Sequence, residues 1–323
     1  MQGKYTRNVS FLIIFFIIFG LLAIWQPKTF LSIGNFQSMA FQIPEFGILA
    51  LAMTLSILAG GIDLSIISIT ILSGITSGFV FESFTGTNVN THVVIVLAVF
   101  AALLVSSLCG FINGLLVGWG KLTPILVTLG TSRLFTGTAL VLTKGGAKTN
   151  FPDMFIHFGN GTIKFIPNIF ILFLFIALII SLILNGTKFG FNIYMVGNNP
   201  LVSIFTGIKN KIVLIKVYTL VGLICGIAAL TVMAKTSSIK VGYGTSYLLQ
   251  SVLVAILGGV DPAGGFGTIT GVLLGIFLLQ IISSGFNLLG LSAFLRNVIW
   301  GALLIAVMMI NYFINKNSKN KIK

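Results

Sequence analysis

Residues 186–216 read GTKFGFNIYMVGNNPLVSIFTGIKNKIVLIK, and this stretch separates two groups of long apolar runs. It contains no apolar run of membrane length and carries lysines at its edges, so we expect it to lie in water. Within it, Asn199 is a good helix N-cap, Pro200 suits the first helical position, and Gly207 favours the left-handed conformation that ends a helix. The sequence therefore predicts a short helix from Pro200 to Thr206.

The predicted helix has an apolar face although it is expected in water. Leu201, Ile204, Phe205 and Ile208 follow the i, i+3, i+4, i+7 spacing of one helix face. A helix of about two turns does not stay folded alone in water, because its nucleation costs more than its few hydrogen bonds return. The helix therefore needs a surface to dock on. That surface is either a groove in a soluble partner protein or the membrane domain of the same chain.

The composition is that of a polytopic, all-α membrane protein. Of 323 residues, 56% are hydrophobic and 7% charged, whereas about a quarter of the residues of a soluble domain are charged. The formal net charge of +14 comes from Lys and Arg scattered singly between apolar runs, so no nucleic-acid-binding face is expected. Cys109 and Cys225 lie inside apolar runs without a CxxC pattern, which indicates neither a metal site nor a disulfide framework.

With about 20 residues per crossing, the apolar runs predict about ten spans in one membrane domain, residues 1–323, with a cytoplasmic loop at about 186–212. An even number of spans places both termini on one side of the membrane. Lysine and arginine at the chain ends suit the cytoplasm, so we expect a multi-pass cell-membrane protein with both termini and the central loop inside. The predicted spans lie near residues 10–26, 43–59, 62–81, 93–117, 124–143, 166–185, 213–234, 246–260, 266–286 and 292–314.

Two glycine-rich breaks interrupt the apolar runs. Gly60 and Gly61 precede Asp63 in LAGGID, and a similar LGGVD ends at Asp261. Such breaks must be buried in protein or line a wet cavity, a feature typical of transporters. Asp63 is either the N-cap of the following helix or the anchor of a glycine hinge at a gate, and Asp261 before Pro262 has the same cap pattern. These four residues are the candidate gate or hinge.

Arg133 is the charge that we expect deepest in the membrane. It follows Pro124 by about nine residues, or about 14 Å of helix, and charges at such depth are usually functional. With the hydroxyls of Thr128 and Thr131 it is a candidate polar contact in a translocation path; the alternative is a structural or snorkelling arginine. Arg296, close to a predicted outer loop, is expected to snorkel.

The motifs of an enzyme or a motor are absent from the sequence. No Gly-Lys-Ser/Thr occurs, so this chain cannot hold ATP in a P-loop of its own. The five acidic residues fall near predicted span ends or in loops, which leaves no buried proton relay. The residues therefore predict a transport protein that is not an enzyme and binds no metal or cofactor itself.

Several collinear motifs resemble the permeases of ribose/xylose-type ABC importers. They are GGIDLS (60–65), NGLLVGWGKLTPILVTLGT (113–131), FGFNIYMVGNNP (189–200), LGGVDPAGGFGTITGVLLG (257–275) and FNLLGL (286–291). The resemblance implies a type II importer-like fold and a monosaccharide-like substrate. Implied partners are a second permease subunit, an ATP-binding subunit that holds ATP and Mg, and an extracytoplasmic solute-binding protein. In that family the central loop carries the coupling helix, here Asn199, Pro200, Leu201, Ile204, Phe205, Gly207 and Ile208.

The chain departs from these relatives at two places. Where they often read Gly-Asn-Glu-Ala-Ala, it has Asn198-Asn199-Pro200-Leu201-Val202, so its ATP-binding partner should differ correspondingly. Where they commonly read Leu-Phe-Arg-Gly, it has Thr136 in place of the arginine. Related subfamilies move nucleosides, autoinducer furanosyl compounds or branched-chain amino acids, and these substrates remain alternatives. From other classes, the alternatives are a stand-alone uniporter or ion-coupled carrier and a membrane-embedded transferase.

Overall fold

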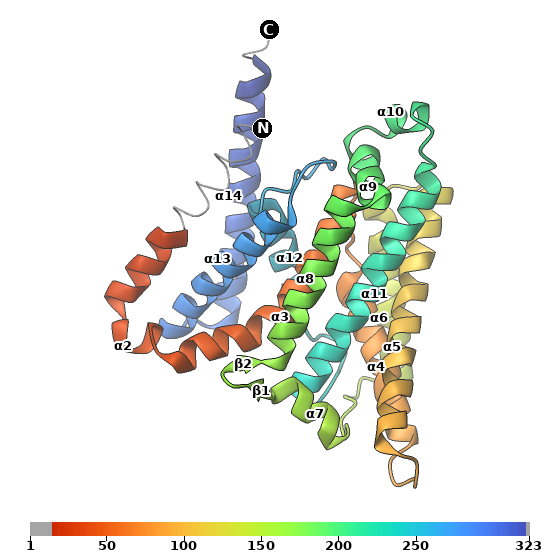
Figure 1. Ribbon diagram of the computed structural model, residues 1–323, viewed down its shortest axis with the longest axis vertical. Helices are drawn as coiled ribbons and strands as arrows, with labels where there is room; N and C mark the ends of the chain where they lie inside the picture. The colour runs from red at the N-terminus through yellow and green to blue at the C-terminus, as the bar shows by residue number, and fades with distance from the viewer. Residues whose placement is uncertain (1–14, 321–323) are drawn as a thin grey trace.

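The computed structural model describes residues 15–320, with side chains to residue 309, as a bundle of helices with one short hairpin (Figure 1). The elements after the helical segment Phe15–Trp25 are α2 (Pro27–Phe30), α3 (Ile33–Leu58), α4 (Ile66–Ser83), α5 (Thr91–Gly114), the π-helix η1 (Leu115–Trp119), α6 (Pro124–Thr143), α7 (Asp153–Asn160), β1 (Thr162–Ile163), β2 (Ile166–Pro167), α8 (Asn168–Gly186), α9 (Lys188–Asn198), α10 (Pro200–Phe205), α11 (Asn210–Thr236), α12 (Thr245–Leu257), α13 (Ile269–Leu288) and α14 (Ala293–Asn320).

The predicted spans coincide with apolar helices. Within the described residues, seven helices are long and apolar enough to cross a membrane: α3, α4, α5 with the start of η1, α6, α8, α11 and α13. Three shorter apolar helices, Phe15–Trp25, Thr245–Leu257 and Ala293–Met309, fall on the other predicted spans. The all-α polytopic class is confirmed. The first residues of the first predicted span, 10–14, and the chain-end residues Lys4, Arg7, Lys321 and Lys323 lie outside the described residues.

The predicted spans 10–26 and 43–59 leave residues 27–42 as a connecting loop, but α2 and the first turns of α3 occupy this segment. Polar side chains of this segment bond to α13. Asn35 accepts a hydrogen bond from Ser284 at 2.9 Å, and Gln42 accepts one from Gln280 at 3.4 Å. α3 also contains Pro44, which removes one helical hydrogen bond and explains the change of direction of α3 in Figure 1.

α11 packs closely against α5. A Cβ atom added to Gly110 of α5 would lie 2.2 Å from the carbonyl oxygen of Tyr218, and one added to Gly222 of α11 would lie 2.2 Å from that of Ser106. Small residues let two membrane helices approach this closely. α5 and α11 therefore form a closely packed pair.

The bundle has two distinct ends (Figure 1). α9, α10 and the end of α14 lie at one, called the α10 end, and α7 with the β1–β2 hairpin lies at the other, called the α7 end. The central loop and the C-terminal end of α14 thus share one end, as the even number of predicted spans requires.

The interpretation of residues 186–216 as lying wholly in water is wrong for α9. This helix begins with Thr187, whose side chain accepts a hydrogen bond from the Gly190 N–H, and it buries Gly190, Ile193, Val196 and Gly197. Its buried positions recur at helical spacing, although no run is long enough to suggest a span. Only α10 and the turns beside it project from the bundle.

A polar cavity and a projecting helix

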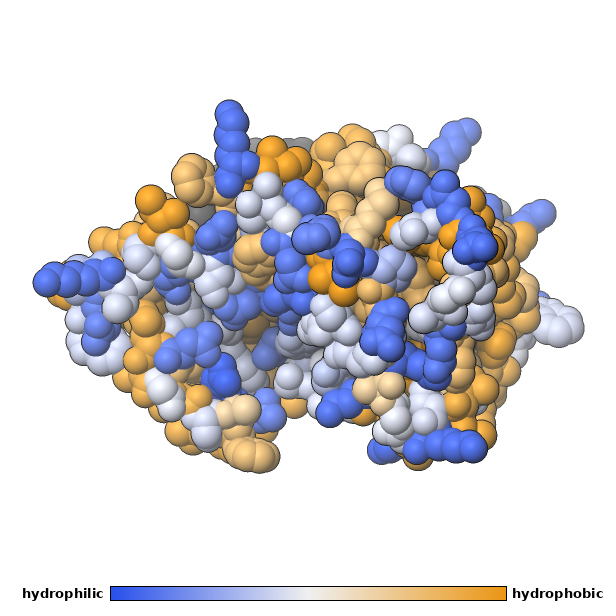
Figure 2. Space-filling model, turned by 90° about the horizontal axis from the view of Figure 1, so that it is seen from below, coloured by the Kyte–Doolittle hydropathy of each residue, from blue (hydrophilic) through white to orange (hydrophobic). Residues whose placement is uncertain are grey.

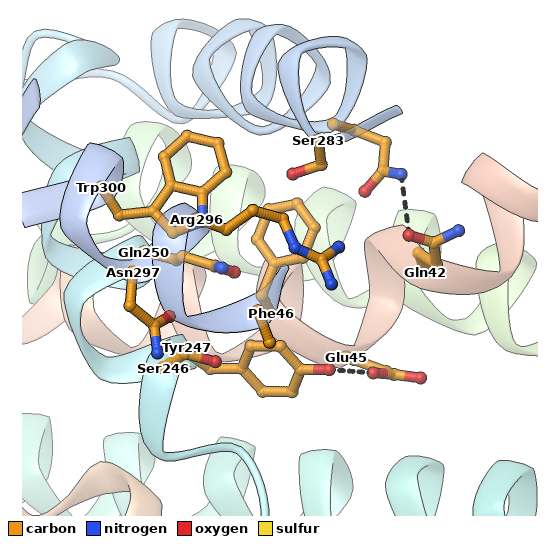
Figure 3. A pocket seen from close by; sticks show the side chains of 12 residues that line it. Gln42, Glu45, Phe46, Ser246, Tyr247, Gln250, Ser283, Arg296, Asn297 and Trp300 are labelled. Carbon is orange, nitrogen blue, oxygen red and sulfur yellow. Dashed lines mark hydrogen bonds between the residues drawn. The ribbon is translucent and has the colours of Figure 1, made fainter. Parts of the chain in front are cut away.

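A polar cavity of about 230 Å³ lies between four helices (Figure 3). Each helix contributes residues at helical spacing, so one polar face of each is turned inward. The lining residues are Gln42, Glu45 and Phe46 of α3, Ser246, Tyr247 and Gln250 of α12, Gln280 and Ser283 of α13, and Ala293, Arg296, Asn297 and Trp300 of α14. The cavity is below the range of about 300–1,000 Å³ that is usual for drug-sized ligands, and it therefore suits a smaller molecule.

The cavity belongs to the α7 end of the bundle. α12 contributes its first turns, and Ile239 just before it forms a β-bridge with Lys148, in the segment that leads to α7. Figure 2 shows this end, where polar side chains gather around a hollow in the middle of the face and apolar side chains form much of its rim.

One carboxylate and one guanidinium line the cavity. Glu45 accepts a hydrogen bond from the Lys235 ammonium on one oxygen and from the Tyr247 hydroxyl on the other. The Glu45 and Lys235 side chains are 12% and 22% exposed, so the pair is mostly shielded from water. Arg296 donates to the amide oxygen of Asn287, a neutral partner. Figure 3 shows its side chain reaching from α14 across the cavity toward α3.

The residues predicted to line a translocation path do not meet this cavity. The Thr128 hydroxyl accepts a hydrogen bond from the Leu64 N–H at 3.0 Å, and Thr131 bonds to the Thr128 carbonyl at 3.4 Å. Both threonines are buried, whereas Arg133 is exposed on the outer side of α6. The predicted grouping of Arg133 with these hydroxyls is therefore not formed, because they lie on different faces of one helix. A transport role for Arg133 stays a prediction.

The cavity residues were missed in the sequence. Arg296 was expected to snorkel, and Glu45 was placed at the end of a span. Ala293, Arg296, Asn297 and Trp300 follow the i, i+3, i+4, i+7 spacing, and the two polar residues among them could have indicated an inward face. Trp300 is 2% exposed, which confirms that this face is turned inward.

The two glycine-rich breaks meet in space at the α10 end. The Gly265 N–H donates to the Leu58 carbonyl at 3.0 Å, and a Cβ atom on Gly264 would lie 2.7 Å from the Gly60 Cα. The end of α9 closes the same contact, because a Cβ atom on Gly197 would lie 1.9 Å from the Leu58 carbonyl oxygen. We call Leu58, Gly60, Gly197, Gly264 and Gly265 the glycine junction. Gly60 adopts a φ of +92°, a conformation that glycine reaches without strain.

Neither predicted aspartate N-cap is formed. α4 begins at Ile66 with Ser65 as its N-cap, and Asp63 instead accepts hydrogen bonds from the Ser65 N–H at 2.8 Å and hydroxyl at 2.6 Å. Asp261 accepts from the Ala263 N–H at 2.9 Å within a turn, and α13 starts later, capped by Thr268. The glycines after Asp261 favour a turn over helix initiation. The hinge or gate roles of Gly60, Gly61, Asp63 and Asp261 stay predictions.

Asp63 is fully buried beside other polar atoms. Its Oδ2 atom, Asn113 Oδ1 and Tyr218 Oη have no hydrogen-bond partner among the described residues. Gly61 packs next to it, since a Cβ atom there would lie 2.6 Å from Pro124 and 2.8 Å from the Tyr218 hydroxyl. The break between α3 and α4 is thus enclosed by α5, α6 and α11.

The projecting helix α10 has the predicted caps. The Asn199 side chain accepts from the N–H groups of Leu201 and Val202 at 3.0 and 3.2 Å, and Gly207 adopts a φ of +80°. The helix is tied to α11 by the Ser203 hydroxyl, which bonds to Asn210 Oδ1 at 2.9 Å. Contacts within the chain therefore orient α10 even without a partner protein.

The apolar side chains of α10 point away from the bundle. Leu201 is 70% exposed, Ile204 57% and Phe205 90%, and we call these three residues, with Val202 at 47%, the apolar tip. The assignment of Ile208 to the same exposed face is wrong. Ile208 is half-buried against the core because the left-handed turn at Gly207 redirects the chain.

Comparison with known proteins decides the family. Residues 35–308 match the family described as "Branched-chain amino acid transport system / permease component". The chain belongs to this family of importer permeases. It is 31% identical over 284 residues to "Autoinducer 2 import system permease protein LsrD" of Escherichia coli (strain SMS-3-5 / SECEC), covering 85% of this permease and 84% of that protein. The protein of the same name from Shigella flexneri has the same identity and coverage. No solved structure matches the permease.

The family assignment confirms the predicted resemblance to ABC-importer permeases. The protein is a multi-pass membrane subunit of a transport system, and members of this family are not themselves enzymes. Within the residues described, no group of three or more His, Cys, Asp or Glu side chains is placed to hold a metal ion.

Proposed function

We propose that the permease moves a small hydroxylated, sugar-like solute into the cell through the polar cavity, driven by ATP hydrolysis on a partner subunit. The observation that carries this proposal is the cavity itself, whose polar lining belongs to helices of a membrane protein. Buried polar groups are costly in a membrane unless they serve a solute path or pair with one another. The helices that line the cavity run between the two ends of the bundle (Figure 1).

The lining favours a sugar-like solute. Amide groups of Gln42, Gln250 and Asn297 and hydroxyls of Ser246 and Ser283 can both donate and accept hydrogen bonds, as sugar hydroxyls require. Phe46 and Trp300, both almost fully buried, contribute the apolar part of the lining. The relatives named for autoinducer 2 import support the same solute class, so a furanosyl compound is the second candidate beside ribose or another monosaccharide.

Each end of the bundle is assigned its own partner protein. We assign the α10 end to the cytoplasm, where the apolar tip binds a groove of the ATP-binding subunit that holds ATP and Mg. The α7 end then faces outward, and the extracytoplasmic solute-binding protein delivers the solute there. A second permease subunit, identical or homologous, completes the path.

The glycine junction connects α10 to the cavity, so it can transmit a conformational change driven by ATP hydrolysis. α10 follows directly on α9, whose end packs against Leu58 of α3 and Gly265 of the turn before α13. Tyr194 of α9 also donates to the Gly267 carbonyl at 3.1 Å. Because α3 and α13 line the cavity, a displacement of α10 is conveyed to two of its walls. Backbone-to-backbone contacts without intervening side chains transmit such a shift with little loss.

Uptake of radiolabelled D-ribose and D-xylose into proteoliposomes tests the proposal. The vesicles contain the permease, its ATP-binding subunit and its solute-binding protein, with ATP on the side of the ATP-binding subunit. We expect accumulation only with ATP and all three proteins. Uptake by the permease alone, or uptake driven by an ion gradient, would contradict the proposal and would show that the permease is a stand-alone carrier.

A further inference from the structure

The charges that face the cavity do not balance. The Glu45 carboxylate forms an ion pair with the ammonium of Lys235 on α11, and this pair neutralises its charge. The residues from α12 and α13 that line the cavity are neutral. Arg296 of α14 is then the one cation among the described lining residues that no carboxylate neutralises.

The guanidinium of Arg296 has donors to spare. An arginine has five N–H donors in a planar fork, and the structure shows one used, by Asn287. Arg296 is half-buried, and its neighbours Phe46 and Trp300 are 3% and 2% exposed. A cation beside such apolar walls attracts a negative group more strongly than a cation in open water.

We propose that the cavity selects a hydroxylated solute that carries one acidic group, and that Arg296 binds this group through two parallel N–H donors. The inference rests on the proposed function and names the substrate class of the same site. The planar guanidinium fork matches the two oxygens of a carboxylate. The amides of Gln250 and Asn297, which line the same cavity, are available for the hydroxyl groups of the solute.

The intrinsic fluorescence of Trp300 provides a direct readout of binding. The chain has three tryptophans, and the other two, Trp25 and Trp119, are 51% and 71% exposed away from the cavity. Replacing those two by phenylalanine leaves Trp300 as the sole reporter in the full-length permease, purified in lipid nanodiscs. The matched probes are D-glucuronate and D-glucuronamide, which share ring and size and differ in one negative charge.

We expect D-glucuronate to bind at least about tenfold more tightly than D-glucuronamide, since hydrogen bonds between charged groups are worth roughly a decade in affinity. Arg296→Gln should remove this preference while weak binding of D-glucuronamide persists. Arg296→Lys should keep the preference at reduced size, because an ammonium keeps the charge without the fork. The matched control is Lys164→Gln, which removes an exposed cation from the β1–β2 hairpin and should leave the preference unchanged.

Equal affinity for the two probes, or a preference that survives Arg296→Gln, would overturn this inference while leaving import of a neutral sugar intact. Binding of neither probe by any variant would also overturn it. The proposed function fails independently, if ATP-dependent uptake is absent for D-ribose, D-xylose and D-glucuronate alike.

Discussion

The backbone N–H of Gly265 donates a hydrogen bond to the carbonyl oxygen of Leu58 at 3.0 Å. This single contact joins the end of α3 to the turn between α12 and α13, two segments far apart in the sequence. Gly197 at the end of α9 lies against the same carbonyl. The glycine junction thus connects the projecting helix α10, through α9, with the helices that form the polar cavity.

Gly197→Ala should destabilise the permease. The added methyl group would lie 1.9 Å from the Leu58 carbonyl oxygen, and a backbone atom cannot give way as a flexible side chain can. We expect a loss of about 1–3 kcal/mol of stability, as for other overpacked sites, measured as a lower thermal unfolding midpoint in detergent. Gly130→Ala in α6 is the control, because no atom lies within 4 Å of the added carbon. Equal midpoints for the two variants would show that the glycine junction is loosely packed.

Phe205→Ala should weaken binding of the ATP-binding subunit at least about tenfold, since an aromatic hot-spot residue is often worth about 2 kcal/mol. Phe205 is 90% exposed, so its removal leaves the fold intact. Co-purification of the ATP-binding subunit measures the effect. Phe165→Ala, at an exposed phenylalanine of the hairpin at the α7 end, should bind normally. Full binding by Phe205→Ala would reduce α10 to a connector.

Gly207→Val should impair coupling for a different reason. The φ of +80° at this position disfavours a β-branched residue, so the chain that leaves α10 would be misdirected. We expect substrate-stimulated ATP turnover in proteoliposomes to fall while the amount of permease in the membrane is unchanged. Wild-type turnover would show that the cap geometry at Gly207 is dispensable.

The orientation can be tested with single cysteines in a variant that lacks Cys109 and Cys225, both of which are buried. In intact cells, a membrane-impermeant maleimide should label Phe165→Cys at the α7 end and should not label Phe205→Cys at the α10 end. Permeabilised cells should show labelling of both. The reverse pattern in intact cells would invert the proposed topology.

Asp63→Asn and Asp63→Ala should differ in stability. Asparagine retains an oxygen acceptor for the Ser65 N–H and removes a buried charge that has no ion-pair partner among the described residues, so we expect an unchanged or higher unfolding midpoint. Alanine leaves the Ser65 N–H without its acceptor, a loss of about 1–3 kcal/mol. A lower midpoint for Asp63→Asn than for Asp63→Ala would contradict this account of the buried carboxylate.

Local chemistry explains what the sequence could predict. The caps of α10 were predictable because Asn199, Pro200 and Gly207 act on the backbone within a few residues. The bounds of α6 agree with the predicted span at 124–143, because Pro124 suits the first helical position and the apolar run that follows has membrane length. The apolar runs likewise predicted the membrane class, since lipid demands helices of a certain length.

Tertiary placement explains what the sequence could not predict. Arg133 and Arg296 are both arginines in apolar helices, and only the packing of α14 against α12 turns Arg296 inward while Arg133 faces out. The start of α3 was missed because the polar Asn35 and Gln42 find partners on α13, far away in the sequence. The meeting of the two glycine-rich breaks also depends on long-range packing that no local pattern encodes.

Blocking the cavity tests the central claim most directly. Ser283 lies on its wall, and Ser283→Trp should fill much of the cavity without touching α10 or the glycine junction. Thr138→Trp, at an exposed site of α6, adds the same side chain elsewhere. The measurement is ATP-dependent uptake of D-ribose and D-xylose in proteoliposomes, with co-purification of the ATP-binding subunit as the check on assembly. The account predicts that Ser283→Trp assembles normally but loses uptake while Thr138→Trp transports like the wild type; full uptake by an assembled Ser283→Trp transporter would contradict it.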